Sequence, residues 1–340
     1  MKVDFHFHLE EGPYSLQWLM RTARALQETS PAVAGAAAGG SSGPGTLPWI
    51  RQAVDQLKLR TESGCFSYEW LERYIRTGRA RGIEQFGVVD HLYRFTEFKG
   101  YYERHMLLDD SPLGRLQREW LDRVCVYSAE QYLEGMRAAA RREPDLAVGV
   151  EADYFPGGED ELRGLLAGLE LDYVIGSVHF YEGWGFDNPD VQERFRDYSL
   201  PELYAGHYAN VIRAAGSGLF DWIAHLDNLK VFGYRPEESG LLPMYREVAA
   251  ALQANGIGTE INTGLRYRYP VKEMCPSPSL LRVLFEHNVP ITLSSDAHFP
   301  DDIGMHLDEA VQAAREAGYR EVMYYRGRVR HMAPIGEHGA

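Results

Sequence analysis

Two short motifs near opposite ends of the sequence each combine side chains that bind metal ions. DFHFH contains His6 and His8, and SSDAH contains Asp296 and His298. Each motif includes or follows an apolar run of β-forming residues, and alternate residues of a strand point to the same side. His6 and His8 can therefore reach one site together, and so can Asp296 and His298. This spacing predicts a metal-dependent enzyme.

The pattern of apolar residues indicates which elements position these motifs. Strands are predicted at Lys2–His8, Gln85–His91, Ala147–Asp153, Tyr173–Phe180, Trp222–Asp227, Gly258–Thr263, Pro290–Asp296 and, more briefly, Glu321–Tyr325. Helices are predicted at Leu16–Gln27, Pro48–Lys58, Tyr68–Arg81, Ala129–Arg142, Asp160–Leu169, Leu203–Ala215, Leu242–Ala254, Ser279–Asn288 and Leu307–Ala317. Alternating strands and helices favour a parallel sheet with crossover helices. Seven or eight such units fit a closed β/α barrel better than an open sheet.

Polar residues fall at the C-terminal ends of the predicted strands. They are His6, His8, Asp90, His91, Glu151, Asp153, His179, His225, Asp227, Glu260, Asn262, Asp296 and His298. In β/α barrels the active site lies at these strand ends, so we expect the side chains to converge there. A single histidine in such a place is more often structural than a ligand. A whole series of them at strand ends is harder to explain in that way.

Some of these residues have a second interpretation. Asp90 could orient His91, and Glu260 could support a ligand rather than bind metal itself. Asp153 and Asp227 fit structural turn groups equally well. The remaining histidines lie in predicted loops or helices and are read as structural: His105, His207, His287, His306, His331 and His338.

The donor types suggest the metals. Imidazole and carboxylate groups together suit Zn²⁺, Mn²⁺ or Fe²⁺. These groups are too numerous for one ion and predict two or three ions that share bridging carboxylates. Such clusters lower the pKa of a bound water and hold the attacking and leaving oxygens of a phosphoryl transfer.

Composition narrows the class of protein. The 340 residues are 45% hydrophobic and 25% charged, a composition that is ordinary for a soluble globular protein. The formal net charge of −14 argues against nucleic-acid binding. Cys65, Cys125 and Cys275 lack the spacing of a disulfide framework or zinc ribbon. The N-terminus has no signal-peptide core and no apolar run could span a membrane, so a cytoplasmic location is expected. Ser30–Thr46 is rich in Ala, Gly, Ser and Pro and is interpreted as a flexible insertion.

The ordered motifs DFHFH, VVDH, GVEAD, IGSVHF, IAHLD, EINTGLR and LSSDAH resemble those of the polymerase and histidinol phosphatase (PHP) superfamily. SVHFYEGWGFDNP, EINTGLRYR and SSDAHFPDDIG are most similar to its histidinol-phosphatase branch. The resemblance covers nearly the whole chain and implies one domain, residues 1–340, with a distorted (β/α)7 barrel and a trinuclear metal centre. It also implies hydrolysis of L-histidinol phosphate to L-histidinol and phosphate in histidine biosynthesis.

Carried over residue by residue, the resemblance implies a set of metal ligands. They are His6, His8, His91, Glu151, His179, His225, Asp296 and His298, with Glu10 as an extra ligand and Glu11 as its substitute. Glu151 would bridge two ions. His179 and Asp296 would also take part in catalysis, which we expect to be direct in-line hydrolysis by metal-activated water.

The substrate needs cationic and polar partners as well. Arg266, just after the sixth strand, is the first choice for holding the phosphate during catalysis, because arginine offers a planar fork to phosphate oxygens. Arg268 and Arg94 are weaker candidates. The ammonium and imidazole groups of the substrate could meet Glu97, Tyr93 or Trp184.

Three other functions remain open at this point. The same core could hydrolyse another small phosphate ester, such as a nucleotide or sugar phosphate, or phosphotyrosine. It could be a non-catalytic PHP module, although such modules often have incomplete ligand sets. An amidohydrolase usually needs a bridging lysine, or a substitute for it, in mid-barrel, whereas Lys230 falls in a predicted loop. For the favoured function we expect a small-molecule partner, no membrane contact, and a monomer or homodimer.

Overall fold

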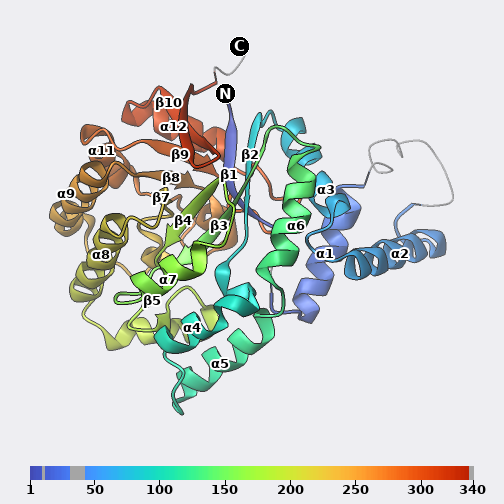
Figure 1. Cartoon of the computed structure of the whole chain (residues 1–340), viewed down its shortest axis with the longest axis horizontal. Helices are drawn as coiled ribbons and strands as arrows, with labels where there is room; N and C mark the ends of the chain where they lie inside the picture. The colour runs from blue at the N-terminus through green and yellow to red at the C-terminus, as the bar shows by residue number, and fades with distance from the viewer. Residues whose placement is uncertain (10–11, 31–42, 337–340) are drawn as a thin grey trace.

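The computed structural model describes residues 1–9, 12–30 and 43–336, and its centre is a sheet of seven parallel strands (Figure 1). The strands, in the order in which they are hydrogen-bonded, are β1 (Val3–His8), β2 (Gln85–Val89), β3 (Leu146–Asp153), β4 (Tyr173–Ser177), β7 (Trp222–Ile223), β8 (Gly258–Asn262) and β9 (Ile291–Ser294). Chain order and sheet order agree, as expected when each connection crosses over to the neighbouring strand.

The two edges of this sheet meet just beyond its last strand. The Asp296 amide donates to the His6 carbonyl at 2.8 Å, and the His8 amide donates to the Ala297 carbonyl at 2.7 Å. The seven strands therefore form a nearly closed β/α barrel, which confirms the predicted fold class. Every residue of β1 is buried, because the strand has the barrel interior on one side and helices on the other.

Twelve α-helices surround the described part of the barrel and connect its strands.

 They are α1 (Leu16–Glu28), α2 (Leu47–Ser63), α3 (Tyr68–Ala80), α4 (Lys99–His105), α5 (Pro112–Val124), α6 (Ala129–Ala140), α7 (Glu159–Leu166), α8 (Leu200–Gly216), α9 (Glu238–Asn255), α10 (Gly264–Arg268), α11 (Pro278–Glu286) and α12 (Leu307–Ala317). Local signals start several of them: the Ser15 side chain accepts from the Trp18 amide, and Ser128 forms a capping box with Gln131.

Several elements differ from the sequence-based expectations. The final predicted strand exists as β10 (Glu321–Arg326), but it pairs antiparallel with β11 (Val329–Pro334) in a separate hairpin. A second small hairpin, β5 (Phe180–Tyr181) and β6 (Trp184–Gly185), and helices α4 and α5 were not predicted. The sequence predicted a strand of six residues at β7, whereas only Trp222–Ile223 is a strand and the rest turns into a loop.

The first strand also departs from simple alternation. Its register against β2 shifts between Asp4 and Phe7. Phe5 packs across the barrel on Tyr173 and Trp222, with ring centroids 5.4 and 6.3 Å away, whereas Phe7 stacks on a ring of α3. The irregularity includes His6, yet His6 and His8 still point to the same site.

The insertion predicted at 30–46 falls mainly on residues 31–42, which lie outside the described residues. Just after them, Thr46 caps α2 by accepting from the Trp49 amide. In the described part of the chain, none of the helices is both long and apolar enough to cross a membrane. The two ends of the described chain adjoin, because the Met1 ammonium donates to the Pro334 carbonyl at 2.8 Å.

Candidate metal centre

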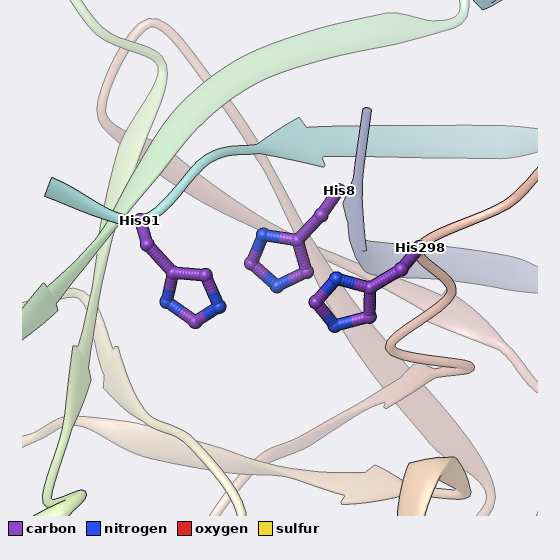
Figure 2. Close-up of side chains that lie close together, drawn as sticks. All are labelled: His8, His91 and His298. Carbon is purple, nitrogen blue, oxygen red and sulfur yellow. The ribbon is translucent and has the colours of Figure 1, made fainter. Parts of the chain in front are cut away.

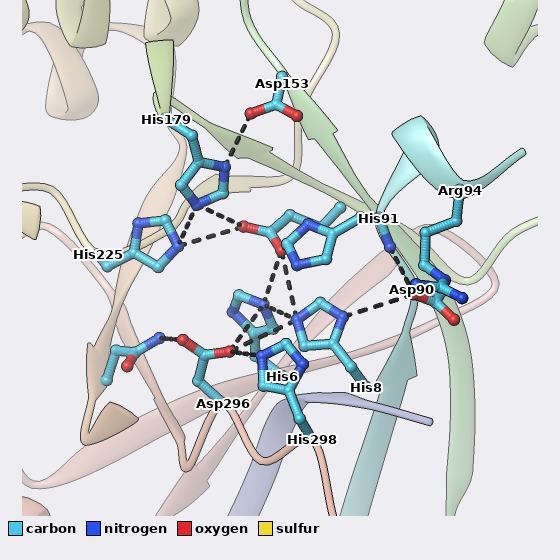
Figure 3. A network of polar contacts seen from close by, with 12 residues as sticks. His6, His8, Asp90, His91, Arg94, Asp153, His179, His225, Asp296 and His298 are labelled. Atoms are coloured by element: carbon cyan, nitrogen blue, oxygen red, sulfur yellow. Dashed lines mark hydrogen bonds and ion pairs between the residues drawn. The ribbon is translucent and has the colours of Figure 1, made fainter. Parts of the chain in front are cut away.

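Eight potential ligands converge at the C-terminal ends of the strands (Figure 3). They are His6 and His8 on β1, His91 after β2, Glu151 on β3, His179 after β4, His225 after β7, and Asp296 and His298 after β9. All are buried. The strand-end arrangement expected from the sequence is therefore present for every one of these side chains.

Glu151 lies at the centre of this cluster, and its two oxygens face different sets of histidines. Oε2 is 3.2 Å from His6 Nε2, 3.4 Å from His8 Nε2 and 2.9 Å from His91 Nδ1. Oε1 is 3.2 Å from His225 Nε2 and 3.6 Å from His179 Nε2. A carboxylate placed between two donor sets is suited to bridge two metal ions.

A second carboxylate, Asp296, lies on the opposite side of the β1 histidines. Its Oδ1 atom is 3.5 Å from His8 Nε2, 4.0 Å from His6 Nε2 and 3.4 Å from His298 Nε2. Figure 2 shows His8 between His91 and His298, with ring centroids 4.2 and 4.4 Å away. Three groups have donor atoms that all lie within 4.8 Å of one another: His8–His91–His298, His6–His8–Asp296 and His91–Glu151–His179.

In two of the candidate ligand rings, the nitrogen that points away from the cluster contacts a carboxylate. His6 Nδ1 lies 3.1 Å from Glu260 Oε2, and His179 Nδ1 lies 2.8 Å from Asp153 Oδ1. The Tyr102 hydroxyl donates to the other Asp153 oxygen at 2.8 Å. These contacts fix the ring orientations and leave both Nε2 atoms facing the cluster. Glu260 therefore supports a candidate ligand, which was one of its two interpretations. Asp153 does the same, whereas the sequence offered it as a ligand or a structural turn group.

The other open interpretations also find an answer in the geometry. The Asp90 carboxylate accepts the His91 amide at 2.9 Å. Asp227 accepts the Lys230 ammonium at 2.8 Å and the Ser277 amide at 2.9 Å, so it is a buried structural group. Lys230 also donates to the Met274 carbonyl at 2.7 Å and does not line the cavity described below.

The protonation of the cluster depends on burial and on its internal charges. Burial alone raises the pKa of Glu151, but the charges of His91, His6 and His179 lower it well below its usual range. Asp296 behaves similarly, because Arg268 and its histidine neighbours outweigh burial and lower its pKa. Burial lowers the pKa of His91 to about 4 despite the nearby Glu151. Both carboxylates are therefore anionic at neutral pH.

Two ligands have backbone conformations that side-chain-bearing residues rarely adopt. His225 has φ 24° and Asp296 has φ 51°. Hydrogen bonds hold both residues in place: the His225 amide donates to Glu260 Oε1 at 3.1 Å, and the Asp296 amide donates to the His6 carbonyl at 2.8 Å. Such strain is tolerated where the surrounding structure over-determines the conformation.

A buried carboxylate outside the ligand set anchors the loop that carries Asp296 and His298. Asp4 accepts the Ser295 amide at 2.9 Å, the Ser295 hydroxyl at 2.5 Å and the Gly304 amide at 3.0 Å. Burial raises the pKa of Asp4 to about 6, although these hydrogen bonds oppose the shift. The first residue of DFHFH thus positions the second motif.

Six of the eight candidate ligands line a cavity of about 120 Å³, hereafter the inner cavity. Its lining comprises His91, Glu151, His179, His225, Asp296 and His298, together with Tyr93, Trp120, Phe180, Asp187, Asn228, Val231, Leu265, Arg268 and Tyr269. Polar donors therefore occupy one part of the wall and aromatic rings much of the rest.

The structure places the three candidate phosphate-binding arginines in three different environments. Arg268 lines the inner cavity and donates to Asp296 Oδ2 at 2.7 Å. Arg266 does not: it lies 40% exposed in another groove, where it pairs with Glu309 at 3.3 Å and donates to the Lys272 carbonyl. Arg94 is buried beside Asp90, at 3.8 Å, and also lies outside the cavity lining. The geometry therefore favours Arg268 as the candidate, whereas the sequence put Arg266 first.

Of the residues suggested for the rest of the substrate, only Tyr93 lines the inner cavity. The Glu97 carboxylate accepts the Ala129 amide at 3.1 Å, and Trp184 is buried against other aromatic rings. Asp187 was missed, although it lies in the SVHFYEGWGFDNP motif that carried the resemblance. Glu10 and Glu11 lie outside the described residues.

The histidines read as structural have local partners away from this cavity. His207 Nε2 lies 3.0 Å from the Leu226 carbonyl, and His287 Nδ1 lies 2.8 Å from the Val283 carbonyl. His306 pairs with Glu309, His105 lies beside Glu161, and His331 stacks on a tyrosine of its hairpin. His338 lies outside the described residues.

The donor set fits divalent transition metals. His6 Nε2 and His8 Nε2 lie only 3.0 Å apart and aim at the same region, where carboxylate oxygens also converge. Negative carboxylates and neutral imidazoles are the ligand forms that such ions require, and a cation would compensate the buried negative charge. The ligands would be the eight side chains named above.

Comparisons with known proteins agree with this arrangement. The model of the PHP domain family matches residues 57–264. A probable histidinol-phosphatase of Deinococcus radiodurans is 40% identical over 233 residues, which cover 66% of this chain and 85% of that protein. The histidinol-phosphatase of Bacillus subtilis is 26% identical over 200 residues, or 52% of this chain and 73% of that protein.

Two solved structures share the fold at 17% sequence identity. One is a histidinol phosphate phosphatase from Lactococcus lactis in complex with zinc, L-histidinol and phosphate, with a TM-score of 0.55 over 76% of this chain and 92% of that one. The other is a putative histidinol phosphatase from Listeria monocytogenes, with a TM-score of 0.59 over 70% and 93%. From the matched family model, the related sequence in Deinococcus and the ligand cluster, we conclude that this chain belongs to the PHP domain family.

Proposed function

We propose that this protein is a metal-dependent phosphatase that hydrolyses L-histidinol phosphate to L-histidinol and phosphate. The observation that carries the proposal is the cluster of eight buried candidate ligands with Glu151 at its centre, next to an inner cavity lined by an arginine. Relatives named histidinol-phosphatase support the substrate. A cytoplasmic location, a monomeric or homodimeric assembly, and one domain over residues 1–340 belong to the same proposal.

The metal content follows from the three overlapping donor groups, which support two or three ions of zinc, manganese or iron. Bound ions would activate water for attack on phosphorus and stabilise the oxygen that leaves. Glu151 would bridge, and Asp296 would bind through Oδ1 while Oδ2 accepts from Arg268. His179 would bind through Nε2 while Asp153 accepts the proton on Nδ1.

Arg268 would hold the non-bridging oxygens of the phosphate. Its guanidinium already lies beside Asp296, so a phosphate at the ligand cluster would be within reach of the same side chain. Charge on these oxygens must be stabilised in the transition state, which a fixed guanidinium does without reorganising. The Asp296 contact fixes it in that place.

The experiment that tests this proposal couples metal analysis to phosphate release. Purified protein should contain two or three transition-metal ions per chain and should have its highest kcat/KM on histidinol phosphate among nucleotides, sugar phosphates and phosphotyrosine. Removing the ions with a chelator should abolish turnover, and adding Zn²⁺, Mn²⁺ or Fe²⁺ should restore it.

Other outcomes would favour the alternatives. A higher kcat/KM on another ester would replace histidinol phosphate as the substrate while retaining the phosphatase chemistry. Full activity in metal-free protein would contradict the metal mechanism. Absence of turnover on every ester by metal-loaded protein would favour a non-catalytic module.

A further inference from the structure

Asp187 lies in the wall of the inner cavity, on the segment that follows the β5–β6 hairpin. The backbone on either side of it is fixed by other groups. The Phe186 amide donates to the His179 carbonyl at 3.1 Å, and the Asn188 side chain accepts the Asp190 amide at 2.9 Å. The Asp187 side chain is therefore held at the cavity without being needed to build the loop.

The Asp187 carboxylate has no cationic partner within the described ranges, where no other side chain forms a hydrogen bond or ion pair with it. The nearest imidazoles serve other carboxylates: His179 contacts Asp153 and Glu151, and His225 contacts Glu151. Burial accordingly raises the pKa of Asp187, partly opposed by His179. A partly buried carboxylate without a partner is costly and is stabilised by a ligand that brings a positive charge.

The lining of the inner cavity thus contains groups for both signs of charge. The candidate metal ligands and Arg268 suit an anionic phosphate, whereas Asp187 suits a cation. Aromatic rings make up more of the same wall; Tyr93 and Trp120 have ring centroids 4.7 Å apart, and Tyr93 stacks on His91 at 4.5 Å. A flat imidazole ring fits such a wall.

We propose that Asp187 binds the ammonium group of the substrate and makes the enzyme selective for phosphate esters that carry a primary amine. This inference rests on the proposed phosphatase function and adds a residue that determines specificity. Asp187 would form a charge-assisted hydrogen bond with the ammonium group. A substrate analogue that lacks the amine could not form this bond.

The test uses two substrates that differ only in the amine: L-histidinol phosphate and its deamino analogue, 3-(imidazol-4-yl)propyl phosphate. We expect Asp187→Asn to lower kcat/KM for histidinol phosphate about 10- to 100-fold, the range of a lost hydrogen bond to a charged group. Turnover of the deamino analogue should change less than about 3-fold. That second substrate also reports whether the variant is folded and loaded with metal.

Asp190→Asn is the matched control, because Asp190 is an exposed acid on the same segment and does not line the cavity. It should leave both substrates unaffected. Equal losses on both substrates in Asp187→Asn, or a fall in its metal content, would overturn the inference and place Asp187 in catalysis or metal binding. An unchanged preference for the amine would also overturn it.

Failure of the proposed function would look different. Wild-type protein that hydrolyses other phosphate esters but not histidinol phosphate would contradict that function alone. The subsite is then tested in the same way with O-phosphoethanolamine and ethyl phosphate. A loss confined to the amine-bearing ester in Asp187→Asn would support it, and any other pattern would contradict it.

Discussion

Arg266 and Arg268 lie on the same short helix, α10, yet they belong to different regions of the molecule. Arg268 faces the inner cavity, whereas Arg266 lines a groove on the outside, hereafter the outer groove, with Glu309 and Lys272. Residues two apart on an α-helix are rotated by roughly 200°, so they point to nearly opposite sides. Closeness to a strand end in sequence therefore does not decide which arginine reaches the site.

The two regions also differ in how their charges are arranged. In the inner cavity, buried carboxylates face histidines and Arg268, and several of their pKa values are strongly shifted. In the outer groove, Arg266 and Glu309 are 40% and 47% exposed, so solvent screens their interaction. We therefore expect substitutions in the inner cavity to change chemistry and those in the outer groove to change little.

The largest effect is expected for Asp296→Ala. This change removes a proposed ligand and the partner of Arg268, so several kcal/mol of transition-state stabilisation should be lost and kcat/KM should fall roughly 10³-fold or more. Metal analysis of the variant should show fewer ions per chain. Asp110→Ala, at an exposed site, is the control. Turnover at the wild-type rate in Asp296→Ala would show that Asp296 is not part of the metal centre.

Arg268→Ala should have the next largest effect. Loss of one preorganised donor to the phosphate should lower kcat/KM about 10²-fold. Arg268→Lys should recover part of the activity, since it restores the charge but not the planar fork. Steady-state kinetics on histidinol phosphate measure the kcat/KM of both variants. If Arg266→Ala were the more damaging of the two, the assignment of the regions would be reversed.

Glu260→Gln should have a smaller effect that appears first in metal binding. Glu260 contacts His6 Nδ1 and accepts the His225 amide, so the substitution disturbs the orientation of two ligands. Loss of such support typically costs about 10- to 100-fold in metal affinity or activity. A chelator titration followed by turnover measures it, with the exposed Glu286→Gln as control. Unchanged metal affinity would mean that Glu260 only fills space.

Arg266→Ala should have the smallest effect. An exposed ion pair contributes about 0–1 kcal/mol, so the free energy of unfolding should fall by no more than that. The kcat/KM on histidinol phosphate should stay within about 2-fold of wild type, because no contact joins Arg266 to the inner cavity in the described structure. Denaturant unfolding and kinetics check both values.

Much of the fold, and the convergence of the candidate ligands, could be predicted from the sequence. The alternation of strands and helices predicted the barrel, and parallel strands must end at the same rim, so residues at their ends had to converge. All eight candidate ligands that the sequence placed at strand ends do lie close together in the structure. The hairpin β5–β6 escaped prediction, and β7 was predicted too long, because two-residue strands leave no periodic pattern.

The sequence by itself determined which chemistry the protein could carry, since the donor types and their strand-end positions are local properties. Only the tertiary structure decided which neighbours each donor has. It placed Glu151 between two sets of histidines, turned Arg268 inward and Arg266 outward, and left Asp187 facing the cavity. These outcomes depend on contacts between segments far apart in the chain and on backbone conformations such as the positive φ of Asp296, which no residue pattern specifies.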